Sequence, residues 1–202
     1  MIVLVIGLAL FLGVHSVRIV ADDWRSATMT RIGERRWKGV HSLLAALGLV
    51  LIVWGYGIAR TDPVVVWQPP LWTRHLAALL MLPAFVLLVA AYVPGNRIKA
   101  AVGHPMVLGV KLWAVAHLAS NGTLADIVLF GSFLVWAVLD FRSARRRLPG
   151  EGTTALRLPP GEESAPVPML AAPDLIVIAL GLIGWAVFGM LLHAWLIGVR
   201  PF

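Results

Sequence analysis

Six apolar stretches, each close to the length of a membrane span, limit what this chain can fold into. They cover residues 2–20, 39–59, 74–93, 105–120, 122–141 and 174–199. An α-helix needs about 20 apolar residues to cross a hydrocarbon core of about 30 Å. The sequence therefore predicts an all-α, polytopic membrane helical bundle of about six transmembrane helices, of which 105–120 is the shortest.

The composition agrees with a membrane protein. Of the 202 residues, 59% are hydrophobic and 13% are charged, whereas soluble domains carry about a quarter charged residues. Nine tryptophans fit the aromatic belts at the two membrane interfaces. The chain has no cysteine, which excludes disulfides, thiolate metal ligands and the covalent attachment of a c-type haem.

The net charge of +7 is interpreted as a topology signal. Most basic residues fall in the first, third and fifth loops: Arg25, Arg31, Arg35, Arg36, Lys38, Arg97, Lys99, Arg142, Arg145, Arg146, Arg147 and Arg157. The opposite side holds Arg60, Arg74 and Arg200. Because cytoplasmic loops are enriched in Lys and Arg, the odd-numbered loops are predicted to be cytoplasmic and both termini periplasmic. No folded basic domain remains that would bind nucleic acid.

The apolar pattern divides the chain into three parts. Residues 1–141 form a predicted five-span core, 142–173 a cytoplasmic Pro/Gly-rich linker, and 174–202 a C-terminal transmembrane helix. Within the linker, the Pro-, Gly- and Glu-rich composition of residues 148–173 predicts disorder. The charged residues 21–38 are interpreted as a loop, and the first stretch as a retained span, because no basic region precedes it. Pro83 predicts a kink in the third span.

The six histidines are the candidates for chemistry inside the membrane. Four lie near the ends of spans: His41, His75, His104 and His193. An imidazole is tolerated at such a position, so we predict structural or interfacial roles for these four. At about 1.5 Å per residue, His15 lies roughly 20 Å from the outer end of its span and His117 roughly 18 Å from the inner end. Imidazoles this deep are expected to face the protein interior and have a partner.

Two deep imidazoles on different spans, with no Cys or Glu near them, favour a b-type haem over structural zinc, which takes four ligands. Glycines of the spans are expected to open a slot for the haem ring: Gly7, Gly13, Gly109, Gly181, Gly184 and Gly189. Arg18, three residues after His15, is a candidate for a haem propionate, and Lys111 is a second candidate. Simpler interpretations stay open: Arg18 pairs with Asp22, Lys111 reaches the interface, and His15 and His117 are structural.

Four runs of sequence resemble the NnrU family of bacterial membrane proteins, which are relatives of plant 15-cis-zeta-carotene isomerase. The runs are FLGVHS at 11–16, LVLIVWGYGIAR at 49–60, GHPMVLGVKLWAVAHLASNG at 103–122 and LFGSFLVWAVLDFRS at 129–143. The resemblance covers the first five spans and extends loosely to the sixth. It implies a multi-pass protein of the bacterial inner (cytoplasmic) membrane. NnrU itself is associated with nitrite and nitric oxide reduction in denitrification.

The plant relative is a haem b enzyme that isomerises a cis double bond when its iron is reduced. Its haem histidines correspond here to His15 and His117, so the resemblance implies haem b as the cofactor and these two residues as its metal ligands. Ala114 stands where the plant enzyme has a cysteine, which removes a thiolate ligand, and Gly103 stands where it has an arginine. Nothing in the sequence specifies a carotenoid substrate.

Two functional hypotheses of different classes follow. The first is a haem b membrane protein that isomerises a polyene or takes part in nitrite and nitric oxide metabolism, with enzyme activity and catalytic residues left open. The second is a cofactor-free accessory or assembly protein for respiratory or denitrification enzymes. A methyltransferase of the isoprenylcysteine type is disfavoured, because residues 103–109 lack the Arg and Tyr of its motif. A transporter is disfavoured because no clear inverted repeat is present.

Overall fold

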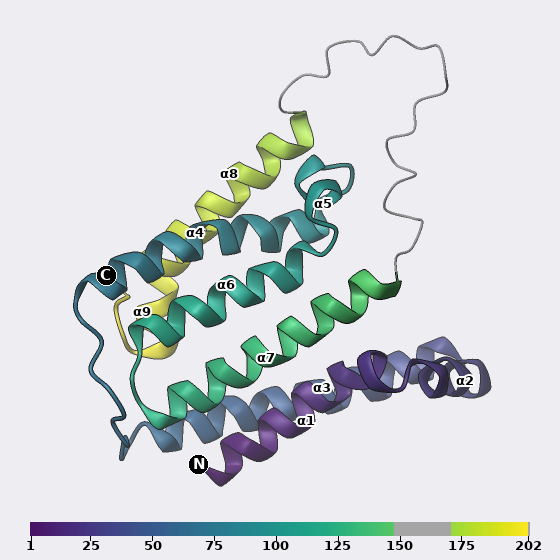
Figure 1. The fold of residues 1–202 in the computed structure, drawn as a ribbon, viewed down its shortest axis with the longest axis horizontal. Helices are drawn as coiled ribbons and strands as arrows, with labels where there is room; N and C mark the ends of the chain where they lie inside the picture. The colour runs from purple at the N-terminus through teal and green to yellow at the C-terminus, as the bar shows by residue number, and fades with distance from the viewer. Residues whose placement is uncertain (148–170, 202) are drawn as a thin grey trace. The chain divides into compact units, whose positions relative to one another are not determined.

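A computed structural model of the chain describes residues 1–147 and 171–201 (Figure 1). The described helices are α1 (Ile2–Val20), α2 (Asp22–Ile32), α3 (Glu34–Ala59), α4 (Trp72–Tyr92), α5 (Arg97–Val102), α6 (Pro105–Ser120), α7 (Leu124–Arg147), α8 (Ala172–Val187), the π-helix η2 (Phe188–Leu192) and α9 (His193–Ile197). Five helical stretches are long and apolar enough to cross a membrane, with α8, η2 and α9 forming one of them, and α6 is a shorter apolar helix. The prediction of an all-α polytopic bundle is confirmed for the described residues.

Two spans begin and end where the sequence predicts. The first span is α1, and the fourth is α6, which starts at Pro105 because a missing N–H costs nothing in the first turn of a helix. The other end of α6 is closed by Asn121, whose backbone N–H and side-chain amide both donate to the His117 carbonyl at 2.9 Å. α4 continues through Pro83.

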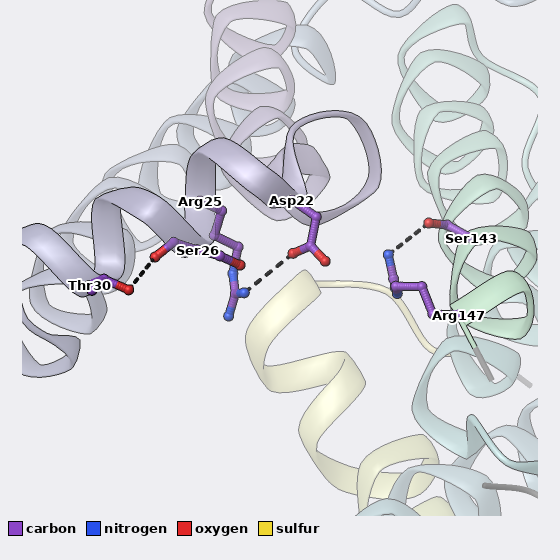
Figure 2. Close-up of polar contacts among 6 residues, drawn as sticks. All are labelled: Asp22, Arg25, Ser26, Thr30, Ser143 and Arg147. Atoms are coloured by element: carbon purple, nitrogen blue, oxygen red, sulfur yellow. Dashed lines mark hydrogen bonds and ion pairs between the residues drawn. The ribbon is translucent and has the colours of Figure 1, made fainter. Parts of the chain in front are cut away.

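The interpretation of residues 21–38 as a loop is wrong, because this segment is helical. It contains α2 and the first residues of α3, separated by Gly33 at a φ of 88°. Figure 2 shows two contacts along α2: Arg25 pairs with Asp22 at 3.4 Å, and the Thr30 hydroxyl donates to the Ser26 carbonyl. Acidic residues in a first turn and ion pairs between residues three or four apart stabilise polar helices. Glu34 and Lys38, in the first turns of α3, form another such ion pair at 2.7 Å.

The helix predicted to end at Phe141 runs six residues further, to Arg147. Three arginines lie in its last turn, where cations interact favourably with the helix dipole. Arg147 also donates to the Ser143 hydroxyl at 2.8 Å (Figure 2). Residues 142–147 of the predicted linker are therefore helical, and residues 148–170 lie outside the described part of the chain.

The chain forms two compact units. Unit 1 comprises Met1–Pro70 and His117–Asp140, and unit 2 comprises Leu71–Ala116 and Phe141–Phe202. Unit 1 thus holds α1 to α3, the last turn of α6 and most of α7. Unit 2 holds α4, α5, most of α6, the end of α7 and the C-terminal helices.

The main contact of unit 1 joins α1 to α3, whose backbones touch at glycine positions. A Cβ added at Gly7 would lie 2.6 Å from the Ile52 nitrogen, and one at Gly48 would lie 2.8 Å from the Phe11 nitrogen. Gly55 meets the backbone of Leu4 in the same way. Small residues allow such close approach between membrane helices, and Gly48 and Gly55 provide it on α3.

In unit 2, α4 approaches α8 closely at Gly181 and contacts it through side chains around Gly184 and Trp185. Val86 lies over Gly181, and the Trp185 indole donates to the Ala78 carbonyl at 3.0 Å. The buried carboxylate of Asp174 joins α8 to α5 by accepting from the backbone N–H of Arg97 at 2.6 Å. This bond satisfies an N–H at the start of α5 that has no partner within its own helix.

Candidate functional site

His15 lies near the C-terminal end of α1, half-buried, with one ring nitrogen already engaged. Its Nδ1 is 2.6 Å from the Phe11 carbonyl oxygen. Because a carbonyl can only accept, Nδ1 carries the proton, and in the neutral imidazole Nε2 keeps its lone pair. Histidines that ligate metals commonly hold their other nitrogen in this way, which fixes the tautomer and orients the ring.

Aromatic side chains surround the His15 ring within unit 1. The Phe11 ring centroid is 4.4 Å from that of His15, and the Trp136 ring lies edge-on at 6.0 Å. Phe133, one turn before Trp136 on α7, packs on Phe11 at 5.7 Å. The result is an apolar setting for the free nitrogen, as a haem ligand requires.

The imidazole of His41 lies beside that of His15, with ring centroids 5.1 Å apart in an edge-on arrangement. The sequence did not predict this contact, because residues 21–38 were interpreted as a loop and His41 was placed at the end of its span. Since α3 begins at Glu34, His41 lies about 10 Å inside the helix. If residues 34–38 are included in the helix, His41 no longer lies at the end of its span, and its depth becomes compatible with that of His15.

His117 lies on the last turn of α6 and packs on Phe130 of α7, with ring centroids 4.6 Å apart. Within unit 1, α7 therefore carries Phe130 against His117 and Trp136 against His15. These two positions are separated by six residues, or about 9 Å along the helix. Both predicted ligands thus contact one helix, with Phe133 between the two contact positions.

The cationic candidates have different surroundings. Arg18 is exposed, one turn after His15, while the Asp22 carboxylate that was considered as its partner is paired with Arg25. Lys111 belongs to unit 2, where its ammonium lies 3.8 Å from the centre of the Phe141 ring. His104 also contacts Phe141, edge-on at 6.2 Å.

Two buried nitrogens have no hydrogen-bond partner among the described residues: Trp136 Nε1 and His104 Nε2. An unpaired buried donor costs roughly 1–3 kcal/mol. The Trp136 N–H belongs to a side chain that packs on His15, so an acceptor group brought by a ligand would relieve this cost. The nitrogen of Trp136 and the tautomer of His15 are the features of unit 1 that fit a ligand with a metal and acceptor groups.

A metal site built from three or more protein ligands is not found in residues 1–147 and 171–201. Nor do most of the glycines expected to open a slot remain free. The space beside Gly7 is filled by the α3 backbone. Within unit 2, Gly109 faces Ala84, Gly181 faces Val86 and Gly184 faces Phe85. Helix packing uses these four glycines, whereas an added Cβ at Gly13 would meet nothing within 4 Å.

Unit 1 also contains a buried polar cluster that the sequence revealed only in part. The Tyr56 hydroxyl donates to Asp126 Oδ1 at 2.5 Å, and Asp126 Oδ2 accepts from the Thr123 N–H and hydroxyl at 3.0 and 2.6 Å. Asp126 is 4% exposed. Thr123 and Asp126 form a capping box for α7, for which the T-x-x-D spacing is a local signal in the sequence, whereas the pairing with Tyr56 arises from tertiary packing.

Unit 2 carries a groove between α4 and α8 of about 360 Å³, lined by His75, Ala78, Leu79, Leu82 and Trp185. His75 lies in the first turn of α4 and is exposed. His193 is half-buried, and its Nδ1 lies 2.7 Å from the Val199 carbonyl oxygen. The structure thus places His75 at the surface of unit 2 and His193 partly below it.

Comparison with protein-family models matches residues 3–201 to the family described as NnrU protein. The match spans nearly the whole chain and so includes residues of both units. No curated protein and no solved structure matches the sequence.

Proposed function

The chain belongs to the NnrU family, and from this membership and the surroundings of His15 we propose that it is a membrane protein that binds haem b through His15 and His117. The observation that carries the proposal is the His15 imidazole, whose Nδ1 is held by the Phe11 carbonyl and whose Nε2 is free to bind a metal. The unpaired Trp136 N–H beside it supports the same interpretation.

Each named residue would contribute a different part of the binding. His15 and His117 supply neutral nitrogen ligands from two helices that both contact α7, and Phe11, Phe133 and Trp136 exclude water around His15. Without cysteine the chain offers no thiolate ligand. Arg18 and Lys111 are the cations that we propose for the two propionates.

Haem supplies a redox-active iron, while the protein supplies ligation, orientation and a dry pocket. We propose that this chemistry acts in nitrite and nitric oxide metabolism or in the cis-trans isomerisation of a polyene. A substrate that must contact the metal requires one of the two imidazoles to withdraw. From the distribution of basic residues we also propose that the protein lies in the inner membrane with both termini periplasmic.

Haem titration into the purified full-length protein tests the ligand assignment. We expect a Soret band with one haem per chain for the wild type, a loss of at least tenfold in haem affinity for His15→Ala and His117→Ala, and no change for His75→Ala, whose side chain is exposed in unit 2. Unchanged titration curves for both ligand variants would contradict the assignment. A wild-type protein that takes up no haem would favour the second hypothesis, a cofactor-free accessory protein for respiratory enzymes.

A further inference from the structure

Three basic side chains of unit 2 gather around the ring of Phe141. The Lys111 ammonium lies 3.8 Å from the ring centre, the Arg145 guanidinium carbon lies 5.8 Å away, and the His104 ring contacts it edge-on at 6.2 Å. We call Lys111, Arg145 and His104 the cation cluster.

The cation cluster is built from two helices by simple spacing. His104 immediately precedes α6 and Lys111 follows seven residues later, which is two turns along the same face. Phe141 and Arg145 are four residues apart on α7, so they are neighbours on its surface. The two faces meet at the Phe141 ring, which brings basic groups from separate helices to one place.

No carboxylate neutralises the cation cluster within the described residues. The ion pairs of this part of the chain are Arg25–Asp22 and Lys38–Glu34, both in unit 1. In the described part of unit 2 the acidic residue is Asp174, whose carboxylate accepts from the N–H groups of Arg97 and Ala171. Among residues 1–147 and 171–201, the ion pairs therefore leave the charges of Lys111 and Arg145 without a carboxylate partner.

This arrangement leaves a partly buried charge and an unpaired buried nitrogen close together. Lys111 is half-buried in an apolar helix, and the attraction of its ammonium to an aromatic face offsets only part of the cost of a charge in a membrane span. His104 Nε2 is buried without a hydrogen-bond partner, although buried polar atoms are nearly always paired. One anionic acceptor would both neutralise the Lys111 charge and give His104 Nε2 a hydrogen-bond partner.

We propose that the cation cluster binds a phosphate or carboxylate group of a membrane-soluble ligand. Lys111 and Arg145 would donate charge-assisted hydrogen bonds to it, with His104 Nε2–H as a third donor. Arg145 lies in the last turn of α7 beside Arg146 and Arg147, where the apolar stretch ends and lipid phosphates are found. A phospholipid phosphate is thus the expected source, and a haem propionate, which rests on the function proposed above, is the other source of the same chemistry.

Lipid retention by the haem-free, full-length protein tests the proposal. Native mass spectrometry after exchange into detergent with equal phosphatidylglycerol and phosphatidylcholine should show retained phosphatidylglycerol in the wild type. We expect at least a fivefold loss in Lys111→Gln, retention in Lys111→Arg, and wild-type behaviour in Lys99→Gln, a matched control because Lys99 is exposed and donates to the Ala91 carbonyl. His104→Gln and Arg145→Gln should each give a smaller loss, and they keep the test decisive if Lys111→Gln fails to fold.

A second arm distinguishes the two sources. If Lys111→Gln leaves lipid retention unchanged but weakens haem binding several-fold relative to Lys99→Gln, the anion is the propionate. If the variant changes neither, the cation cluster binds no anion and the proposal is wrong. Because the lipid arm uses no haem, it decides the phosphate assignment even if the protein binds no haem.

Discussion

The two units join their main helix pairs through glycine, but the close contact extends over three glycines in unit 1 and one in unit 2. In unit 1, α1 and α3 approach through Gly7, Gly48 and Gly55 until their backbones touch. In unit 2, α4 and α8 come equally close at Gly181, where an added Cβ would lie 2.7 Å from the Val86 Cα, but Gly184 one turn later faces only the Phe85 side chain. There Trp185 donates to the Ala78 carbonyl, and a groove of about 360 Å³ lies beside it. The C-terminal helix of unit 2 also contains the π-helix Phe188–Leu192, a feature that is frequent at functional sites.

This difference shows what each kind of contact can support. Contact between backbones leaves little freedom for the helices to slide, so it fixes the height of His15 on α1 against His41 on α3. Contact through side chains tolerates repacking and leaves space for a ligand. A ligand set with strict geometry is therefore expected beside the α1–α3 contact, whereas the groove between α4 and α8 suits a less specific apolar ligand.

The largest effect is expected from filling a glycine of the close contact. Gly55→Leu should destabilise the protein by about 3 kcal/mol or more, because the added Cβ would lie 2.7 Å from the Leu4 Cα and backbone cannot move aside as a side chain can. Unfolding by SDS in mixed micelles, followed by circular dichroism, measures the change. Gly57→Leu on the same helix is the matched control, since nothing lies within 4 Å of its added Cβ.

The corresponding change in unit 2 should be mild. An added Cβ at Gly184 would lie 3.3 Å from a ring carbon of Phe85, a side chain that can shift. Gly184→Ala is therefore expected to cost less than about 1 kcal/mol. If Gly184→Ala proved as damaging as Gly55→Ala, the contrast between the two units would be wrong.

An intermediate loss of stability is expected from substituting the buried aspartate that accepts hydrogen bonds at the start of a helix in each unit. Asp126→Ala removes the acceptor for Tyr56 and Thr123, and Asp174→Ala removes the acceptor for two backbone N–H groups. We expect losses of about 2–3 kcal/mol for each, because buried donors are left unpaired. The same SDS unfolding assay measures both.

Tyr56→Phe separates the tertiary bond in unit 1 from the cap. It should cost only about 1 kcal/mol, since Asp126 keeps its bonds to Thr123. A cost for Tyr56→Phe equal to that of Asp126→Ala would show that the tyrosine pairing, rather than the capping box, carries the stability of this cluster.

The smallest effect compares two indole N–H groups. Trp185→Phe loses a hydrogen bond to Ala78 and should cost about 1 kcal/mol, whereas Trp136→Phe removes an unpaired donor and should be neutral or slightly stabilising in the haem-free protein. In the haem-loaded protein, Trp136→Phe should instead weaken haem binding. A cost for Trp136→Phe equal to that for Trp185→Phe would mean that Trp136 Nε1 is paired in solution.

Local sequence patterns predicted the bounds of helices better than the contacts between helices. The bounds of α1 and α6 follow from apolar length, a proline and an Asn-Gly, all of which act within a few residues. The helical character of α2 was missed because its polar composition resembles a loop, and this error also misplaced His41. The gathering of Lys111, His104 and Arg145 at Phe141 was beyond sequence reasoning, since it depends on how α6 and α7 pack.

Electron paramagnetic resonance of the ferric, haem-reconstituted protein tests the central claim most directly. Ligation by two imidazoles predicts a low-spin signal for the wild type and for His41→Ala, and conversion to a high-spin signal in His15→Ala and in His117→Ala. A low-spin signal that survives both of these substitutions, or that is lost in His41→Ala but kept in His117→Ala, would contradict the assignment of His15 and His117 as the haem ligands.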